Sequence, residues 1–380
     1  MADEAIVVLG GGVGGVVAAN ELSGRLKEVG HIVLIERNPN QSFAPSYLWV
    51  MTDERRPEAI TRDISRLERK GIEFVAGEIE RIDVGNRLIA ACGREIHFDY
   101  LIVALGAEPA FDAIPGLKDA HTYYHLAGAE RLRDALHTFE GGRLSLVIAG
   151  LPYKCPSAPY EGAMLLEGYF HGRHMRHKVE LSFYSPEPAP MPIAGPAAGD
   201  AVQELLAHKG IAFHPGKVLA AVGDQELRFE DGETAPFDLV IAMPPHRAPQ
   251  VVLDSGLTDA SGWIPVDRHT METEHEGVFA IGDVTSIVLE DGASLPKAGV
   301  FANAQAEVVA RNIAARILGL AKRERFDGKG YCFLETGGGT AGLAQGDFYA
   351  APRRIPLRSP SPVWHWGKVA YERYWLWKWY

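Results

Sequence analysis

The stretch Ala5-Ile6-Val7-Val8-Leu9-Gly10-Gly11-Gly12-Val13-Gly14-Gly15 decides the fold. Its five successive apolar residues predict a strand that is buried on both faces, as in a parallel sheet. Gly10, Gly12 and Gly15 then match the pattern G-x-G-x-x-G, and apolar residues at helical spacing predict a helix that runs to about Lys27. A strand, a glycine-rich turn and a helix in this order indicate an α/β fold built on a parallel sheet.

The residues that follow complete a dinucleotide-binding fingerprint. Gly30 ends the helix, His31 to Ile35 predicts the next strand, and Glu36 comes 21 residues after Gly15. The glycines let backbone N–H groups and the helix N-terminus approach a pyrophosphate. An acid at this distance accepts a hydrogen bond from a ribose 2′-OH. We therefore expect a dinucleotide to bind at this end of the sheet.

The composition limits the other possibilities. The chain has 380 residues, 47% of them hydrophobic, which is enough for two or three soluble domains. The net charge of −11 argues against nucleic acid as a partner, and no apolar run is long enough to predict a membrane-spanning helix. We expect no metal site, because no cysteines form a C-x-x-C pair, and His121 and His125, which have i, i+4 spacing, lack an evident third ligand. Cys92, Cys155 and Cys332 are too few for a disulfide framework, so they are buried small side chains or a long-range redox pair.

Two later segments extend the dinucleotide site. Phe98 to Ala107 predicts a strand that ends in a turn of small residues, and Thr273 to Asp283 predicts a buried strand that ends in Gly282-Asp283. Together with the first fingerprint, they resemble the flavoprotein superfamily with two dinucleotide-binding domains. The resemblance implies FAD as the cofactor. It implies that the adenosine half is held by Gly10, Gly12, Gly15 and Glu36, and that the remainder lies along Ala104, Gly106, Gly282 and Asp283.

The same resemblance implies the architecture. Residues 1–110 and 265–320 would form a discontinuous FAD-binding domain, and residues 111–264 a second Rossmann-like domain inserted into it. Pro109 and Pro244-Pro245 are expected crossings, because proline punctuates linkers. Residues 321–380 would form a separate C-terminal region that ends in an amphipathic aromatic helix.

The inserted domain departs from the superfamily at its glycine-rich loop. After the predicted strand Leu144 to Ile148, the chain reads Gly150-Leu151-Pro152-Tyr153-Lys154-Cys155-Pro156. The prolines offer no N–H to a phosphate, so NAD binding by this domain is disfavoured. Cys155 instead precedes a predicted helix, about Ala158 to Phe170, and follows Lys154; a helix N-terminus and a cation both stabilise a thiolate. Glu161 either exchanges protons with this sulfur or complements the helix dipole.

The other two cysteines lie in different settings. Cys332 is in a strand-like segment, Gly330 to Thr336, followed by three glycines. The glycine run allows a close backbone approach, which in this region suggests the flavin; the alternative is a buried strand cysteine. Cys92 is expected in a hairpin turn outside the site.

At this point the sequence resembles one family, sulfide:quinone oxidoreductase and the flavoprotein subunit of flavocytochrome c sulfide dehydrogenase. The matching segments are Pro152-Tyr153-Lys154-Cys155, Pro159-Tyr160-Glu161, Phe43-Ala44-Pro45-Ser46, Pro296-Lys297-Ala298-Gly299-Val300-Phe301-Ala302, Gly330-Tyr331-Cys332 and Trp366-Gly367-Lys368-Val369-Ala370-Tyr371-Glu372-Arg373-Tyr374. The resemblance implies that Cys155 and Cys332 form a redox-active pair beside the flavin, with Cys155 carrying sulfur and Cys332 on the flavin side. It implies Glu161 as an acid/base group, and further cofactor contacts at Arg37, Ser46 and Lys297.

Two departures from the family pattern matter. Many quinone-linked members have a third cysteine early in the inserted domain, where this chain reads His121-Thr122-Tyr123-Tyr124-His125. Any catalytic step that the third cysteine performs in those members must be absent here or be performed by another group. Cytochrome-linked members tether FAD through a cysteine near the position of Ser46, and residues 43–53 contain none. A covalent flavin is therefore not expected there.

The end of the chain separates quinone from cytochrome as the electron acceptor. Five of the seven tryptophans lie between Trp364 and Trp379, with three basic residues against one acid, Glu372. Tryptophan, tyrosine and basic residues favour the interface of an anionic membrane. The alternative is a helix packed on the core or on another subunit. We take Lys368 and Tyr371 as candidates for the quinone site.

The sequence thus predicts an FAD enzyme that oxidises sulfide to polysulfide or elemental sulfur and reduces a membrane quinone. We expect a monotopic homo-oligomer on the prokaryotic cytoplasmic membrane, on a face that the sequence does not specify. The alternatives are a sulfide dehydrogenase subunit that passes electrons to cytochrome c, an NADH:quinone oxidoreductase, and a flavin-bearing protein without this catalysis.

Overall fold

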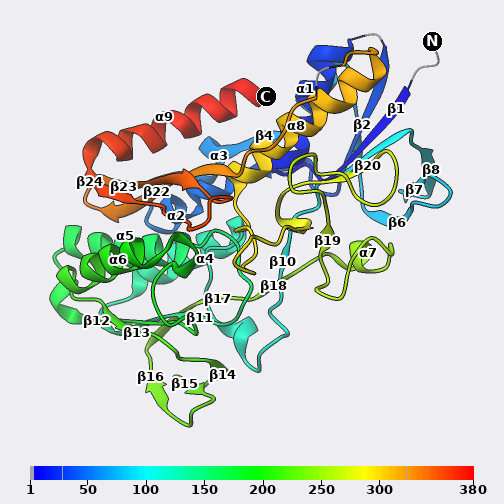
Figure 1. Cartoon of the computed structure of the whole chain (residues 1–380). Helices are drawn as coiled ribbons and strands as arrows, with labels where there is room; N and C mark the ends of the chain where they lie inside the picture. The colour runs from blue at the N-terminus through cyan, green and yellow to red at the C-terminus, as the bar shows by residue number, and fades with distance from the viewer. Residues whose placement is uncertain (1–3, 28, 322) are drawn as a thin grey trace.

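The structure is a computed structural model that describes residues 4–27, 29–321 and 323–380. Its first sheet has five parallel strands in the order β20-β9-β1-β2-β5 (Figure 1). Their bounds are Glu4–Leu9 (β1), Gly30–Glu36 (β2), Ile72–Ala76 (β5), Tyr100–Val103 (β9) and Val278–Ala280 (β20). The strand predicted from Thr273 to Asp283 is thus only the three residues of β20. Because all five strands are parallel, their carboxyl ends lie at one edge of the sheet.

Both faces of this sheet are covered, as the continuous apolar run of β1 predicts. Ile6 and Val8 face helices α1 (Val13–Leu26) and α8 (Gly299–Ile317), which lie side by side in Figure 1. Val7 and Leu9 face a second apolar cluster beneath the antiparallel strands β6 (Ile79–Asp83), β7 (Leu88–Ala91) and β8 (Arg94–His97) and helix α7 (Gln250–Leu253). The helix predicted to run to Lys27 ends one residue earlier.

The second sheet is parallel as well and has the order β13-β12-β11-β17. Its strands are Gly142–Ile148 (β11), Val179–Tyr184 (β12), Ala212–His214 (β13) and Leu239–Met243 (β17). Helices α4 (Leu126–Thr138), α5 (Ala158–Gly172) and α6 (Pro196–His208) belong to this part of the chain, and strands β14 (Leu219–Gly223), β15 (Glu226–Phe229) and β16 (Thr234–Pro236) cover the other face. The two Rossmann-like sheets confirm the predicted fold class.

Short strands join the two halves. β10 (Glu108–Pro109) pairs antiparallel with β18 (His246–Arg247), beside the prolines expected to mark the crossings. The domain boundaries at residues 110, 265 and 320 stay a prediction. The remaining elements are β3 (Asn40–Ser42), β4 (Thr61–Asp63), β19 (Ile264–Pro265), β21 (Thr285–Ser286), α2 (Tyr47–Met51), α3 (Pro57–Ile60) and the 3₁₀ helices η1 (Ala44–Ser46), η2 (Ile64–Lys70), η3 (Leu117–Asp119), η4 (Arg176–Lys178), η5 (Pro192–Ala194) and η6 (Gly282–Val284).

The C-terminal region is an antiparallel sheet with a long helix beside it. Strands β22 (Lys329–Gly337), β23 (Thr340–Asp347) and β24 (Leu357–Ser361) precede helix α9 (Pro362–Trp379), which lies along them in Figure 1. The predicted aromatic helix is thus present, but its residues do not divide simply by polarity. Lys368 and Glu372 are buried, whereas Trp366 and Trp377 are 63% and 77% exposed. In the described part of the chain, no helix is both long and apolar enough to cross a membrane.

Candidate active site

The glycine-rich turn forms a cradle at the carboxyl edge of the first sheet. Gly10 follows β1 with a φ of +100°, and a Cβ there would meet the carbonyl oxygen of Ala104 at 2.5 Å. A Cβ on Gly15 would overlap the carbonyl oxygen of Gly10, so both positions require glycine. A Cβ on Gly12, in contrast, would meet nothing within 4 Å. The backbone at the start of α1 is therefore open to a ligand, where helix N–H groups favour an anion.

Glu36 closes one end of this cradle from the end of β2. Its carboxylate accepts hydrogen bonds from the backbone N–H groups of Gly11, at 2.7 Å, and Asn38, at 2.9 Å. Each oxygen keeps a further lone pair for a ribose hydroxyl. The next residue, Arg37, forms exposed ion pairs with Glu78 and Glu108 at 3.7 and 3.1 Å, and its predicted contact with the cofactor stays a prediction.

The neighbouring strands β9 and β20 complete the cradle. Ala104 follows β9, and Gly106, with a φ of +67°, has open space where a Cβ would lie. Gly282 follows β20 with a φ of +74°, and its N–H donates to Gln305 Oε1 at 2.7 Å. Burial raises the pKa of Asp283, partly against the charges of Lys154 and Lys297. The predicted glycines and acids thus gather along one sheet edge, and their shapes fit a dinucleotide.

Lys297 connects this cradle to the cysteine loop. Its Nζ donates to the carbonyl oxygens of Asp283, at 2.6 Å, and Thr285, at 3.2 Å, and lies 3.3 Å from the ring centre of Trp263. Its carbonyl oxygen accepts the N–H of Cys155 at 2.7 Å. Burial lowers the pKa of Lys297 to about 8. The sequence places these two residues in separate predicted domains, and one backbone hydrogen bond brings them together.

Ser46 has a different neighbour. The residue is fully buried, and its hydroxyl donates to the carboxylate of Glu372 in α9. Arg55 Nε donates to the same carboxylate at 3.0 Å. The structure therefore ties Ser46 to the C-terminal helix.

Cys155 and Cys332 meet, although 177 positions separate them in the sequence. Both thiols are free and half-buried, and each shifts the pKa of the other. Ser157 also contacts both, with its Oγ 3.7 Å from Cys155 Sγ and 2.9 Å from Cys332 Sγ. Cys155 has a left-handed φ of +56°, which directs the chain from the loop into α5. Cys92, which is exposed in the β7–β8 turn, lies apart from this pair, as expected.

The two thiols differ in acidity. A hydrogen bond from Cys332 lowers the pKa of the Cys155 thiol, and Lys368 lowers it further. The same hydrogen bond and burial raise the pKa of Cys332 well above its usual value. In the reduced pair, Cys155 therefore loses its proton more readily than Cys332. The cation that acts on Cys155 is Lys368, whereas the predicted partner Lys154 acts on Asp283 instead.

Glu161 lies in the first turn of α5 and is linked to the thiols through Ser157. Its Oε1 accepts Ser157 Oγ at 2.9 Å, and its Oε2 accepts Lys368 Nζ at 2.6 Å. Burial alone would lower the pKa of Lys368, but the carboxylates of Glu161 and Glu335 outweigh it and raise that pKa. A hydrogen-bonded path thus runs from Cys332 through Ser157 to Glu161.

A second buried carboxylate lies beyond Lys368. Burial raises the pKa of Glu335, although Lys368 and a hydrogen bond to His365 act against it. Glu335 Oε2 is 3.0 Å from His365 Nδ1, and its Oε1 has no hydrogen-bond partner among the described residues. Sequence reasoning missed the roles of Ser157, Glu335 and His365. Of these, only Ser157 could have been found from the sequence, because it lies two residues after Cys155 in the loop that replaces the glycine-rich turn.

The two quinone candidates lie in different places. Lys368 is buried against Glu161, while Tyr371 lines a pocket of about 710 Å³ between α8, α9 and the strands β22 and β23. Its ring centre is 6.0 Å from that of Tyr331, which also lines the pocket and precedes Cys332 in β22. The pocket therefore reaches the strand that carries one of the thiols.

Comparison with known proteins agrees with this geometry. Residues 4–307 match the family model described as pyridine nucleotide-disulphide oxidoreductase. The mitochondrial sulfide:quinone oxidoreductase of Mus musculus is 26% identical over 363 residues, which cover 91% of this chain and 79% of that protein. The sulfide-quinone reductase of Aquifex aeolicus is 27% identical over 390 residues, which cover 98% and 90%.

A solved structure extends the likeness to the whole fold. The X-ray structure of the sulfide:quinone oxidoreductase from Aquifex aeolicus matches with a TM-score of 0.90 and 25% identity, over 99% of this chain and 91% of that one. The family model covers well over half of the sequence, and it spans both parallel sheets and the cysteine loop. The chain belongs to the pyridine nucleotide-disulphide oxidoreductase family.

Proposed function

We propose that this protein is an FAD-dependent enzyme that oxidises sulfide through Cys155 and Cys332 and passes the electrons to a quinone. One observation carries the proposal: Ser157 bridges two thiols of opposite pKa shift, and the loop that carries Cys155 is hydrogen-bonded to Lys297 beside the dinucleotide cradle. Relatives named sulfide:quinone oxidoreductase, which cover most of the chain, support it.

The cradle would hold FAD through the backbone at Gly12 and α1, the carboxylate of Glu36 and the turn at Gly282-Asp283. When bound, FAD accepts two electrons from the thiol pair and later gives them to the quinone. Lys297 would place a cation of pKa about 8 beside this site, so its charge changes near neutral pH.

The first chemical step opens the oxidised cysteine pair. Hydrosulfide attacks Cys155 Sγ, the Cys155–Cys332 bond breaks, and Cys155 becomes a persulfide. Cys332 has a raised pKa, so it is a poor leaving group unless it receives a proton as it departs. Ser157 Oγ lies 2.9 Å from Cys332 Sγ and 2.9 Å from Glu161 Oε1. It can therefore relay that proton from the Glu161–Lys368 ion pair, in which Lys368 Nζ holds the proton.

The second step releases sulfur and restores the pair. Another hydrosulfide attacks the outer sulfur of the persulfide, and Cys155 departs as a thiolate, which its lowered pKa favours. Cys155 thiolate and Cys332 thiol then lose two electrons and one proton to re-form their bond. That proton returns through Ser157 to the Glu161–Lys368 ion pair, while the released disulfane can be extended into polysulfide.

Electrons would leave through the pocket beside Cys332. Tyr331 and Tyr371, whose rings meet edge to face, give an aromatic lining to a volume of about 710 Å³, which has room for a quinone ring. Lys368 does not line this pocket, so we propose that it acts on Glu161 and the thiols.

The exposed side of α9 supports a membrane location. Trp366, Tyr374 and Trp377 are half or more exposed, and such side chains favour a bilayer interface. We propose peripheral binding to the prokaryotic cytoplasmic membrane, where a quinone would enter the neighbouring pocket, and assembly as a homo-oligomer.

The test is anaerobic reduction of the purified holoprotein, followed by flavin absorbance. Sulfide should bleach the flavin, and decylubiquinone should restore it. NADH should bleach it far more slowly, because the loop after β11 carries prolines where a phosphate-binding turn needs N–H groups. Equal bleaching by NADH, or none by sulfide, contradicts the proposal. A Tyr371→Ala variant should bleach normally with sulfide but recover slowly with the quinone.

A further inference from the structure

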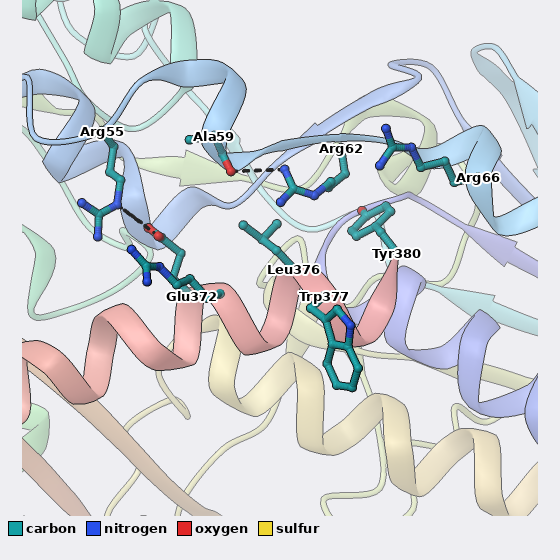
Figure 2. Close-up of a pocket in the computed structure, with 9 residues that line it drawn as sticks. Arg55, Ala59, Arg62, Arg66, Glu372, Leu376, Trp377 and Tyr380 are labelled. Carbon is teal, nitrogen blue, oxygen red and sulfur yellow. Dashed lines mark hydrogen bonds and ion pairs between the residues drawn. The ribbon is translucent and has the colours of Figure 1, made fainter.

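A second pocket, of about 470 Å³, lies against α9 (Figure 2). It shares no lining residue with the pocket of the quinone candidate Tyr371, which opens on another side of the helix. One wall is the chain from Arg55 to Arg66, which contains α3, β4 and the start of η2, and the other is the last half of α9. Four arginines line it: Arg55, Arg62, Arg66 and Arg373. The mechanism above uses none of them.

The charge of this pocket is largely uncompensated. Arg55 is neutralised by Glu372, at 3.0 Å. Arg62 instead donates to the carbonyl oxygens of Ala59 and Thr61, at 3.1 and 2.8 Å. These neutral acceptors orient its guanidinium but do not neutralise its positive charge. Within the described residues, neither Arg66 nor Arg373 forms an ion pair. The side chains that line the pocket, four arginines against Glu372, carry a net charge of +3, in a chain of net charge −11.

The geometry suits an oxyanion with an organic substituent. Figure 2 shows Arg55, Arg62 and Arg66 along one wall, facing Leu376 and Tyr380 of α9. A guanidinium presents paired N–H donors that match the oxygens of a phosphate, and several such forks favour a phosphate over a single carboxylate. Trp377, which is 77% exposed, supplies an apolar border for the rest of the ligand.

We propose that this pocket binds the phosphate of a phosphate ester, either an anionic phospholipid headgroup or a soluble phosphate ester. The pocket itself does not depend on the sulfide chemistry; only the lipid source rests on the proposed membrane face of α9. In that case the arginines would hold a headgroup while Trp377 and Tyr374 enter the interface, which couples membrane docking to the helix that also borders the quinone pocket.

The test compares two probes on the FAD-loaded protein. Flotation with vesicles of phosphatidylcholine, with and without phosphatidylglycerol, measures headgroup binding. Calorimetric titration with sn-glycerol 3-phosphate measures binding of a soluble ester. The variant is Arg66→Glu/Arg373→Glu, which reverses the two unpaired charges. The control is Arg94→Glu, an exposed arginine on β8 that forms no ion pair in the described chain and lies far from α9 in Figure 1.

Basic residues near an anionic surface each contribute severalfold to binding, so the double reversal should weaken it by about tenfold or more. Loss confined to phosphatidylglycerol vesicles identifies a lipid headgroup, and loss for sn-glycerol 3-phosphate identifies a soluble ester. Arg66→Gln/Arg373→Gln should give an intermediate loss, and Arg94→Glu none. The proposal is overturned if the wild type binds neither probe, or if the double reversal binds both as the wild type does. Sulfide bleaching of the flavin, measured on the same samples, reports the proposed enzymatic function separately.

Discussion

Replacing Lys368 by methionine should destabilise the protein more than any surface lysine replacement, because it leaves a buried carboxylate without its cation. Lys368 Nζ lies 2.6 Å from Glu161 Oε2, and the two side chains are only 9% and 3% exposed. Methionine keeps most of the apolar length, so little cavity forms. Breaking a buried ion pair from one side costs about 3–5 kcal/mol, since the remaining charge stays out of water.

Urea unfolding of the FAD-loaded variants, followed by tryptophan fluorescence, measures this cost. The matched control is Lys217→Met, because Lys217 Nζ lies 2.7 Å from both Asp231 and Glu233, whose side chains are well exposed. Loss of such a surface pair costs about 0–1 kcal/mol. The double variant Lys368→Met/Glu161→Gln should recover most of the lost stability, because no buried charge remains. A single variant no less stable than the control, or a double variant no better than the single one, refutes the reasoning.

Other changes test the remaining parts of the account. Ser157→Ala should slow flavin bleaching by sulfide about 100-fold, the size of one general-acid contribution, whereas an unchanged stopped-flow rate excludes the relay. Gly15→Ala should yield protein without FAD, because its Cβ would overlap Gly10, and Gly24→Ala on the same helix, where a Cβ has open space, should keep normal flavin absorbance. Burial lowers the pKa of His246 from 6.5 to about 3, so the folded state binds fewer protons than the unfolded state, and stability falls as pH drops through this window. His246→Gln should remove up to about 5 kcal/mol of that pH dependence, and an unfolding free energy as pH-dependent as in the wild type counts against it.

The first βαβ unit could be predicted because its signals are local. Continuous apolar runs encode β1 and β2, and the glycine spacing encodes a turn in which Gly10 and Gly15 have no room for a Cβ. Carboxyl ends of parallel strands meet at one edge, so the placement of Asp283 also follows from pattern. The length of β20 did not follow, because the residues before Val278 form a turn and bridges rather than a continuous strand.

The surroundings of the thiols were harder to predict. Lys154 is next to Cys155 in sequence, yet the cation that acts on Cys155 is Lys368, which comes from a helix more than two hundred residues away. Charges in α9 look solvent-exposed by composition, but Lys368 and Glu372 are buried because Glu161, Ser46 and Arg55 from other segments satisfy them. The sequence pattern around a residue does not indicate which residues far away in the chain will pair with it.

The central claim is that electrons from sulfide pass through both Cys155 and Cys332 to reach the flavin. Anaerobic stopped-flow measurement of flavin bleaching by sulfide tests it most directly, with Cys155→Ser, Cys332→Ser and the exposed Cys92→Ser as a matched control. The account predicts that each of the first two variants loses bleaching by several orders of magnitude, while Cys92→Ser bleaches as fast as the wild type. Bleaching at the wild-type rate in either Cys155→Ser or Cys332→Ser contradicts it.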